Sequence, residues 1–336
     1  MIRSRAANSI ALSLSVLVLA LGVMACGGAA DAPDAEPSVA QDGTASTTGA
    51  VAPDEVDEVD APVDLPSLRL GAIPDQDPEK LQRLHGALSG YLGEALSVPV
   101  TYVPVTDYAA AVSAFAAGDL DLVWFGGLTG VQARLQAPAA RAIAQRDIDA
   151  EFHSVFIAGA DSGISPFEDA SGLLTLVDRT FTFGSESSTS GRLMPQHFLM
   201  EAGVSLDDFA GEPGFSGSHD ATIQLVEAGS YDAGALNEQV WLSRLEAGEI
   251  DAERVIEVWR TPAYFDYHWV IREDVEARYG EGFIERVQDV LLGLDAADPA
   301  QAEILDLFGA GAFVETRDEN YAQIEAVGRA IGRIQD

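Results

Sequence analysis

A run of hydroxyl side chains in the middle of the chain has the composition of an anion site. Residues 185–190 read Ser-Glu-Ser-Ser-Thr-Ser and are followed by Gly191, which lets a backbone approach a ligand closely. They stand between a short apolar segment and a segment of helical periodicity. Free N–H groups and the positive dipole end at a helix start attract anions, and hydroxyl groups add adjustable donors. One hydroxyl would suffice for an ordinary N-cap, so five in this stretch favour an anion site at Ser188, Thr189 and Ser190.

Two further junctions combine a glycine turn with a helix start. In Ser216-Gly217-Ser218-His219 the histidine falls in the first turn of a helix, where it is able to donate to an oxyanion; a structural histidine is the equal alternative. Residues 124–130 read Trp-Phe-Gly-Gly-Leu-Thr-Gly and offer Gly126, Gly127 and Thr129. Ligands of open α/β sheets bind at the carboxyl ends of strands, where all three junctions fall.

The same residues give little support to catalysis or to a cofactor. Ser188 and His219 with an aspartate would resemble a hydrolase triad, but the glycine-serine-glycine nucleophile elbow is missing. The glycine turns match no dinucleotide or P-loop fingerprint, and the five histidines show no metal-ligand spacing. We therefore expect no catalytic residue, no metal and no cofactor. Arg146 and Arg192 either add positive charge to the site or form ordinary surface ion pairs.

Alternating strand and helix patterns must position these junctions. The first unit has expected strands at 68–73, 100–105, 120–125 and 140–145, and expected helices at 78–96, 108–117 and 130–136. This order predicts a parallel sheet flanked by helices. The second unit has expected strands at 180–183, 212–215, 231–236 and 255–259, and expected helices at 191–202, 219–228 and 240–247.

Two extended segments join the units, at 152–158 and 267–271, and purely helical segments follow at 274–294, 300–307 and 320–334. The α/β fold class therefore takes the form of a two-lobed clamshell, in which the crossings act as hinges around a ligand cleft. The expected lobes are 66–158 with 267–336 for the first and 159–266 for the second.

The N-terminal 26 residues have the parts of a secretory signal: Arg3 and Arg5, then the apolar run 10–23, then small residues. The run is short for a membrane span, although an uncleaved anchor is the alternative. Val-Met-Ala-Cys at 23–26 resembles a bacterial lipobox, which predicts lipidation of Cys26, the single cysteine of the chain. Residues 27–65 lack aromatic residues, lysine and arginine, and we expect them to form a disordered acidic linker.

Composition sets the class of partner. The 336 residues are 47% hydrophobic, enough for a sizeable core, and carry 54 acidic against 19 basic side chains, a formal net charge of −35. Such a surface repels nucleic acid, which excludes binding through phosphate backbones. The acidity reflects either adaptation to salt or plain solubility, and solubility is the simpler interpretation.

Motifs in three places, in the same order, resemble the signature of phosphonate-type periplasmic binding proteins. They are Ser188-Thr189-Ser190-Gly191 with Pro195, then Gly217-Ser218-His219-Asp220, then Asp232-Ala233-Gly234-Ala235. The resemblance covers roughly residues 68–334 and implies the type II periplasmic-binding-protein fold. It implies a non-enzymatic protein that takes phosphonate, phosphite or a related oxyanion to an ABC permease and its ATPase. Residues 73–76, 123–127 and 183–186 are most similar to a branch labelled as selenate binders.

The resemblance also assigns ligand contacts. It carries Ser188, Thr189, Ser190 and His219 over as contacts, together with Tyr108 and Asp266, which precedes the second crossing. At the first-lobe loop the family often has an aromatic contact, whereas this chain has Gly-Gly-Leu-Thr at 126–129. We expect a monomer held by its lipid on the outer side of a bacterial membrane. A binding protein that serves a membrane sensor and an exported phosphoester hydrolase are the alternatives.

Overall fold

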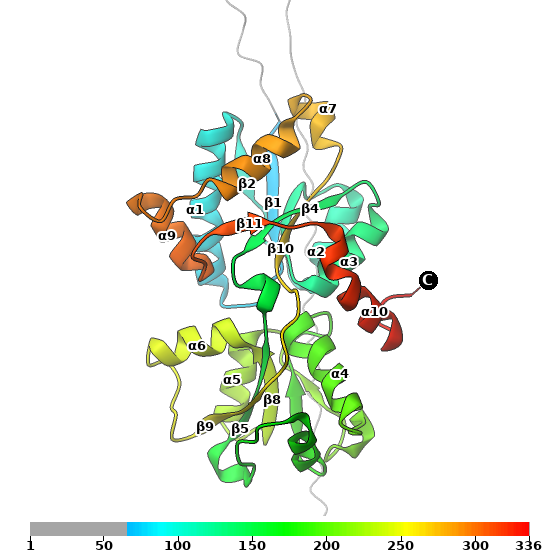
Figure 1. Ribbon diagram of the computed structural model, residues 1–336. Coiled ribbons are helices and arrows are strands. Elements are labelled where there is room, and N and C mark those ends of the chain that lie inside the picture. The colour runs from blue at the N-terminus through cyan, green and yellow to red at the C-terminus, as the bar shows by residue number, and fades with distance from the viewer. Residues whose placement is uncertain (1–65, 336) are drawn as a thin grey trace, which may run out of the picture. The chain divides into compact units, whose positions relative to one another are not determined.

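The computed structural model describes residues 66–335, which form two sheets with helices packed on both (Figure 1). The described residues fall within one compact unit, residues 60–336. The predicted signal peptide, Cys26 and the acidic linker lie outside them. Between residues 66 and 335, no helix has the length and apolar character needed to cross a membrane.

The first sheet has six strands in the order β11-β4-β10-β3-β1-β2. Strand β1 is parallel to β2 and β3, whereas β10 is antiparallel to β3 and β4, and β11 is antiparallel to β4. The sheet is therefore mixed, not purely parallel as the order of elements predicted. Its strands are β1 (Leu68–Ala72), β2 (Val100–Tyr102), β3 (Leu122–Phe125), β4 (Arg141–Arg146), β10 (His268–Ile271) and β11 (Phe313–Glu315).

The second sheet has five strands in the order β7-β6-β8-β5-β9. Strand β6 is parallel to β7 and β8, and β5 runs antiparallel to β8 and β9. Its strands are β5 (Ser154–Gly159), β6 (Phe181–Phe183), β7 (Gly214–Phe215), β8 (Ala233–Asn237) and β9 (Val255–Arg260). The predicted first lobe includes residues up to 158, whereas β5 lies between two strands of the second sheet.

Three helices accompany the second sheet and seven the first within the described residues (Figure 1). With the second sheet are α4 (Met194–Glu201), α5 (His219–Glu227) and α6 (Glu238–Glu246). With the first are α1 (Pro78–Leu96), α2 (Tyr108–Ala117), α3 (Gly127–Gln136), α7 (Val275–Tyr279), α8 (Phe283–Leu292), α9 (Pro299–Phe308) and α10 (Ala322–Ala330).

Local signals explain where these helices begin and end. The Asp77 side chain accepts the N–H groups of Glu79 and Lys80, and a proline occupies the first helical position, so α1 has the predicted bounds. The single helix predicted at 274–294 is two helices, because Gly280 and Gly282 adopt φ of 95° and 79°, conformations that end one helix and precede the next.

Two crossings connect the sheets and pair with each other. The chain leaves β4 through residues 147–153 and returns from β9 through residues 261–267. Phe152 and Tyr264 exchange both backbone hydrogen bonds, at 3.0 and 2.9 Å, and the Asp266 N–H donates to the Asp149 carbonyl at 3.1 Å. The crossings thus place Asp266 beside the entry to the first sheet.

Candidate oxyanion-binding site

The hydroxyl run forms a single wide helical turn ahead of α4. Residues Thr189–Leu193 are a π-helix, and the Leu193 N–H donates to the Ser188 carbonyl five residues earlier at 3.0 Å. Pro195 has no N–H to give to the Gly191 carbonyl, which accepts instead from the Gly184 N–H at 2.9 Å. The helix predicted at 191–202 therefore begins earlier, in a turn that presents three consecutive hydroxyl groups.

The hydroxyl turn packs directly against the start of α3 in the other lobe. The Leu128 N–H donates to Thr189 Oγ1 at 2.9 Å, and the Gly127 N–H donates to Asp266 Oδ1 at 2.8 Å. A Cβ at Gly126 would lie 3.2 Å from Thr189 Oγ1 and 3.3 Å from Asp266 Oδ1. The glycines at this junction thus allow both groups to approach the helix start, and the predicted residues of the two lobes meet here.

Three buried polar atoms at this junction have no hydrogen-bond partner among the described residues. They are the Tyr108 hydroxyl, Ser190 Oγ and Asp266 Oδ2, from side chains at most 2% exposed. Buried polar atoms are paired in nearly all proteins, and leaving each unpaired costs about 1–3 kcal/mol. The arrangement therefore suits an additional polar molecule that supplies these atoms with partners.

The other hydroxyls keep hydrogens to donate. Ser188 Oγ accepts the Gly191 N–H at 2.9 Å, and Thr189 Oγ1 accepts the Leu128 N–H, so each uses its oxygen as acceptor and retains its O–H. Thr129 differs, because its hydroxyl donates to the Gly126 carbonyl at 3.1 Å inside its own helix. In this arrangement the Thr129 hydroxyl has no free hydrogen to donate to a ligand, although the sequence suggested it as a contact.

His219 is fully buried with both ring nitrogens engaged. Nδ1 accepts the Asn237 N–H at 3.3 Å, so the ring proton lies on Nε2, which is 3.2 Å from the Tyr267 hydroxyl. Burial lowers the pKa of His219 to about 4, so the ring is neutral at pH 7. A Cβ at Gly191 would lie 3.3 Å from this ring. The histidine thus supports the hydroxyl turn, and its ring is not the free donor that the sequence suggested.

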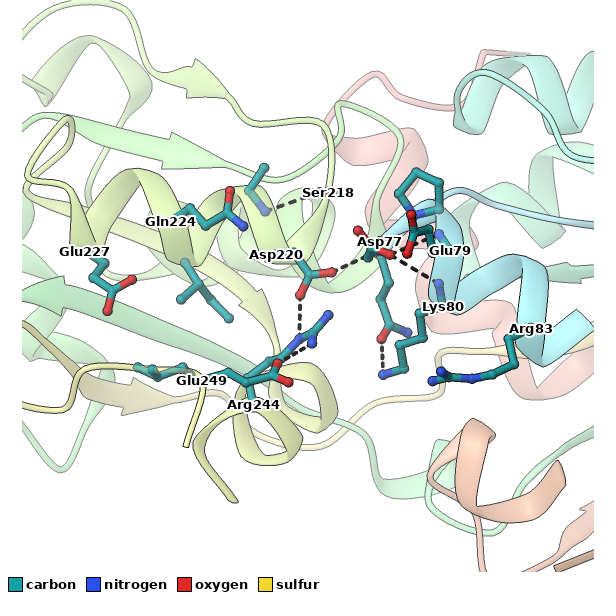
Figure 2. Close-up of a pocket in the computed structure, with 15 residues that line it drawn as sticks. Asp77, Glu79, Lys80, Arg83, Ser218, Asp220, Gln224, Glu227, Arg244 and Glu249 are labelled. Carbon is teal, nitrogen blue, oxygen red and sulfur yellow. Dashed lines mark hydrogen bonds and ion pairs between the residues drawn. The ribbon is translucent and has the colours of Figure 1, made fainter. Parts of the chain in front are cut away.

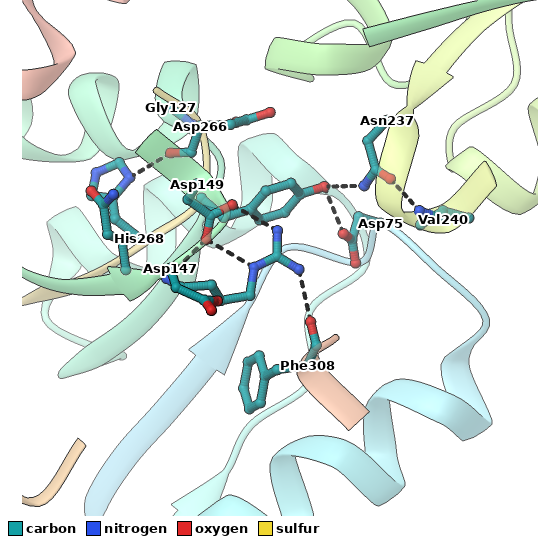
Figure 3. A network of polar contacts seen from close by, with 12 residues as sticks. Asp75, Gly127, Asp147, Asp149, Asn237, Val240, Asp266, His268 and Phe308 are labelled. Atoms are coloured by element: carbon teal, nitrogen blue, oxygen red, sulfur yellow. Dashed lines mark hydrogen bonds and ion pairs between the residues drawn. The ribbon is translucent and has the colours of Figure 1, made fainter. Parts of the chain in front are cut away.

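His219 contacts a hydrogen-bond network that contains Asp75 and Asn237, both labelled in Figure 3. The Tyr267 hydroxyl donates to Asp75 Oδ2 at 2.8 Å and accepts from Asn237 Nδ2 at 3.0 Å. The backbone N–H of His219 donates to the Asp75 backbone carbonyl at 3.0 Å. Burial raises the pKa of Asp75 to about 6. The network joins the segment after β1 to the end of β8 and to the start of β10.

Asp266 is a buried carboxyl that lies against the hydroxyl turn. Burial raises its pKa to about 7, although the hydrogen bond from the Gly127 N–H lowers it. Near neutral pH this carboxyl therefore exists with and without its proton. It is able either to donate to an oxyanion or to accept a proton from one.

The two arginines have different surroundings. Arg146 donates to both oxygens of Asp149 at 2.8 and 2.7 Å and to the Phe308 carbonyl at 2.8 Å (Figure 3), and its guanidinium lies 4.9 Å from the Tyr267 ring. It is fully used as a structural cation behind the network. Arg192 packs on Phe183, 4.2 Å from the ring centre, and makes no hydrogen bond to the three orphaned atoms.

A groove of about 600 Å³ lies at the rim between the starts of α1 and α5 (Figure 2). Asp220 there accepts the Asp77 N–H at 2.8 Å and pairs with Arg244 at 2.9 Å, so it links the two lobes. Five carboxylates face three cations in the groove, which disfavours a small anion. None of residues 188–190 lines it.

Sequence reasoning missed the network that supports the site. Asn237 and Tyr267 carry no motif of their own, and Asp75 was noted only as part of a resemblance. The available signal was position: Asn237 ends β8 and caps α6, accepting the Val240 N–H. Residues at the carboxyl ends of neighbouring strands are candidates for one site.

Known proteins resemble the chain over this same region. Residues 70–321 match the family described as ABC transporter, phosphonate, periplasmic substrate-binding protein. A probable ABC transporter phosphite binding protein of Prochlorococcus marinus (strain MIT 9301) is 48% identical over 269 residues, covering 80% of this chain and 91% of that protein. A phosphate-import protein of Mycolicibacterium smegmatis is 27% identical, covering 58% of this chain and 63% of that protein.

Solved structures agree with this likeness. The Prochlorococcus marinus protein PhnD1, in complex with methylphosphonate, has a TM-score of 0.78 and 48% identity, covering 80% of this chain and 99% of that one. The aliphatic sulphonate binding protein of Escherichia coli, at 14% identity, has a TM-score of 0.53, covering 80% of this chain and 87% of that one. The two-lobed fold predicted from the sequence is thereby confirmed.

Proposed function

The chain belongs to the periplasmic substrate-binding proteins of phosphonate ABC transporters, and we propose that it captures phosphite or a small phosphonate between its two lobes. The family consists of binding proteins without enzymatic activity, as the sequence indicated, so the hydrolase alternative is set aside. The name of the 48% identical relative supports phosphite, and the complex formed by PhnD1 supports methylphosphonate.

The observation that carries this proposal is the set of orphaned atoms at the lobe junction. A tetrahedral oxyanion accepts hydrogen bonds from the hydroxyls of Tyr108 and Ser190 and from the retained O–H groups of Ser188 and Thr189. These donors come from α2 in the first lobe and from the hydroxyl turn in the second, so a bound anion would bridge the lobes. His219 and Gly191 act in this proposal as supports of the turn.

Asp266 sets the protonation that the ligand must have. Its free oxygen is buried among the same groups, and an ionised carboxylate there repels a fully ionised anion. A shared proton between Asp266 and a ligand oxygen removes that repulsion. We expect phosphite and phosphonates, which keep a proton near neutral pH, to be preferred over sulfate and selenate. The resemblance to selenate binders is therefore not carried into the proposal.

The remaining proposals concern delivery and anchoring. We propose that the lobes close on the ligand and that the closed form delivers it to a permease, with Cys26 as the lipid attachment site. The closing motion uses the crossings at residues 147–153 and 261–267, which are joined by the Phe152–Tyr264 bridge and by the hydrogen bond from the Asp266 N–H to the Asp149 carbonyl. A binding protein that serves a membrane sensor would bind the same ligand. Genes for an ATPase and a permease next to the gene of this protein would favour import over sensing.

A calorimetric panel tests the ligand. Phosphite, methylphosphonate, phosphate, sulfate, selenate and selenite are titrated into the wild-type protein at pH 7, and phosphite or methylphosphonate should bind most tightly. Ser190→Ala should weaken them, and Ser230→Ala, at an exposed position, is the matched control. Equal affinity of Ser190→Ala and wild type, or a preference for sulfate or selenate, contradicts the proposal.

A further inference from the structure

Helix α3 presents one face to the segment that carries Asp266. Gly127, Gly130 and Arg134 follow one another at spacings of three and four residues, which places them on the same side of the helix. The Gly127 N–H donates to Asp266 Oδ1 at 2.8 Å, and Arg134 Nη1 lies 2.9 Å from His268 Nε2. A Cβ at Gly130 would overlap the His268 ring, so the ring needs a glycine at this position. One helix face thus contacts both Asp266 and the histidine two residues after it.

The tautomer of His268 follows from its two hydrogen-bond partners. A guanidinium group only donates, so Nε2 accepts from Arg134 and the ring proton lies on Nδ1. Nδ1 is 3.0 Å from the backbone carbonyl of Asp266, to which it therefore donates (Figure 3). Burial, followed by the charge of Arg134, lowers the pKa of His268 well below its usual range. The ring is therefore neutral at pH 7 and has one defined donor.

Packing holds this ring in place. It stacks on Tyr321 with 3.7 Å between the ring centroids and 25° between the ring planes. Arg134 lies 5.1 Å from the centre of the same tyrosine ring, and its Nε pairs with Asp318 Oδ1 at 3.2 Å. His268 and Tyr321 are both buried. The ring is therefore fixed from both sides against the Asp266 carbonyl.

These contacts leave Asp266 with a single free polar atom. Its N–H donates to the Asp149 carbonyl at 3.1 Å, its carbonyl accepts from His268, and its Oδ1 accepts from Gly127. Its Oδ2 has no hydrogen-bond partner among residues 66–335, and this is the oxygen that the proposed function gives to the ligand. Supporting hydrogen bonds of this kind are what keep a binding group in its productive geometry.

We propose that His268 is a positioning residue of the oxyanion site: its Nδ1–H holds the backbone of Asp266 so that Oδ2 is kept for the ligand, and Arg134 sets the tautomer that this requires. The inference rests on the proposed function, because it concerns the carboxyl that shares a proton with the ligand. His268 acts through Asp266 and not by contact with the ligand. Without the bond from Nδ1 the segment is free to shift and the carboxyl gains access to water, which lowers its pKa toward that of a free aspartate.

The other ionisable groups around this pair leave Asp266 as the reporter. Arg134 faces the histidine, and Asp149, which is paired with Arg146, lies near the carboxyl of Asp266. Four tyrosines near Asp266 stay neutral because burial raises the pKa of each well above its usual range: Tyr108, Tyr264, Tyr267 and Tyr321. A change in the titration of Asp266 therefore reports how its carboxyl is held.

Two substitutions of His268 separate its two hydrogen bonds. His268→Gln places an acceptor for Arg134 near the position of Nε2 but loses the bond to the Asp266 carbonyl, whereas His268→Asn keeps a donor near the position of Nδ1. Carbon-13 NMR of carboxyl groups follows Asp266 in the ligand-free protein, and its signal is identified by its absence in Asp266→Asn. The titration midpoint should fall by at least about one pH unit in His268→Gln and should stay at the wild-type value in His268→Asn. His197→Gln, at a half-buried histidine of α4, is the matched control.

Phosphite binding at pH 7 gives a second readout. A midpoint lowered by about one unit from about 7 reduces the protonated fraction of Asp266 about fivefold, so the Kd of His268→Gln should rise by about that factor. His268→Asn should bind phosphite like the wild type. If the wild-type protein does not bind phosphite, the proposed function fails, while the NMR titration of the ligand-free protein still tests the role of His268.

A purely structural histidine would affect both variants alike. Any result in which the Asp266 midpoint of His268→Gln is not clearly the lower of the two overturns the proposal, and thermal unfolding checks that both variants are folded. Nitrogen-15 NMR of the wild-type ring tests the same idea without a substitution. The ring proton should lie on Nδ1 from pH 5 to about 8.5, and a proton on Nε2 or a charged ring in this range overturns the assignment.

Discussion

Replacing Asp266 by asparagine should remove the part of the pH dependence of stability and of ligand binding that this carboxyl contributes. The folded chain holds the Asp266 proton more tightly than the unfolded chain, because burial raises its pKa from 3.8 to about 7. The stability that this carboxyl contributes is therefore complete below about pH 4 and is lost as the pH rises through about 7. The difference corresponds to up to about 4 kcal/mol at pH 8, which Asp266→Asn should restore in the ligand-free protein.

The same titration of Asp266 should control the affinity for the ligand. A fully ionised anion needs the Asp266 proton, so above pH 7 its Kd should rise about tenfold per pH unit, as the protonated fraction falls by that factor. In Asp266→Asn the amide nitrogen donates at every pH and its oxygen still accepts the Gly127 N–H, so the slope should disappear. The preference for phosphite over sulfate should also narrow by about tenfold or more, the value of one hydrogen bond to a charged group.

Calorimetry with phosphite and sulfate between pH 6 and 8.5, and urea unfolding at pH 5 and 8, measure these quantities. Asp289→Asn is the matched control, because Asp289 is exposed and makes no side-chain hydrogen bond among the described residues. A wild-type Kd that is flat over this range, or an equal slope in Asp266→Asn, would refute the proton-sharing argument.

Two other predictions follow from the structure, and one follows from the sequence. Ser190→Ala should weaken phosphite binding about tenfold. The Tm of the ligand-free protein should not change, because Ser190 Oγ has no hydrogen-bond partner to lose within residues 66–335. Calorimetry and thermal unfolding check this, and a lower Tm without loss of affinity would contradict it. Asp220→Asn should lower phosphite affinity about threefold through faster dissociation, because the carboxylate that accepts the Asp77 N–H from the other lobe loses its charge; stopped-flow measurement of the dissociation rate checks this. Cys26→Ser should move the protein from the membrane fraction to the soluble fraction of cells, and continued sedimentation with membranes would argue against lipidation.

Element positions were predictable because local chemistry specifies them. The N-cap at Asp77, followed by proline, located α1, and the start of α2 at Tyr108 follows Asp107, whose side chain accepts the Ala110 N–H. Strand direction was not predictable in this way. Whether β10 runs parallel or antiparallel to β3 depends on the side from which the crossing returns, and no residue within β10 encodes that.

The site was predictable only in its local part. Hydroxyl and glycine residues at a strand–helix junction signal an anion site, and the turn at Ser188–Ser190 was found from them. The carboxyl of Asp266 was suggested by resemblance, but its pKa depends on burial by the other lobe. The neutral state and the tautomer of His219 were not predictable either. Asn237 and Tyr267, which fix the tautomer, lie 18 and 48 residues away in sequence.

The proposed site would let a chain with a net charge of −35 hold an anion, because distant surface charge contributes little there. At physiological salt the Debye length is about 8 Å, so surface carboxylates contribute little inside a closed cleft. What remains is local: hydroxyl donors, a carboxyl whose pKa is about 7, and Arg146, whose charge is already paired with Asp149. Without a free cation in contact, affinity depends on the number of donors satisfied, and specificity depends on the proton shared with Asp266.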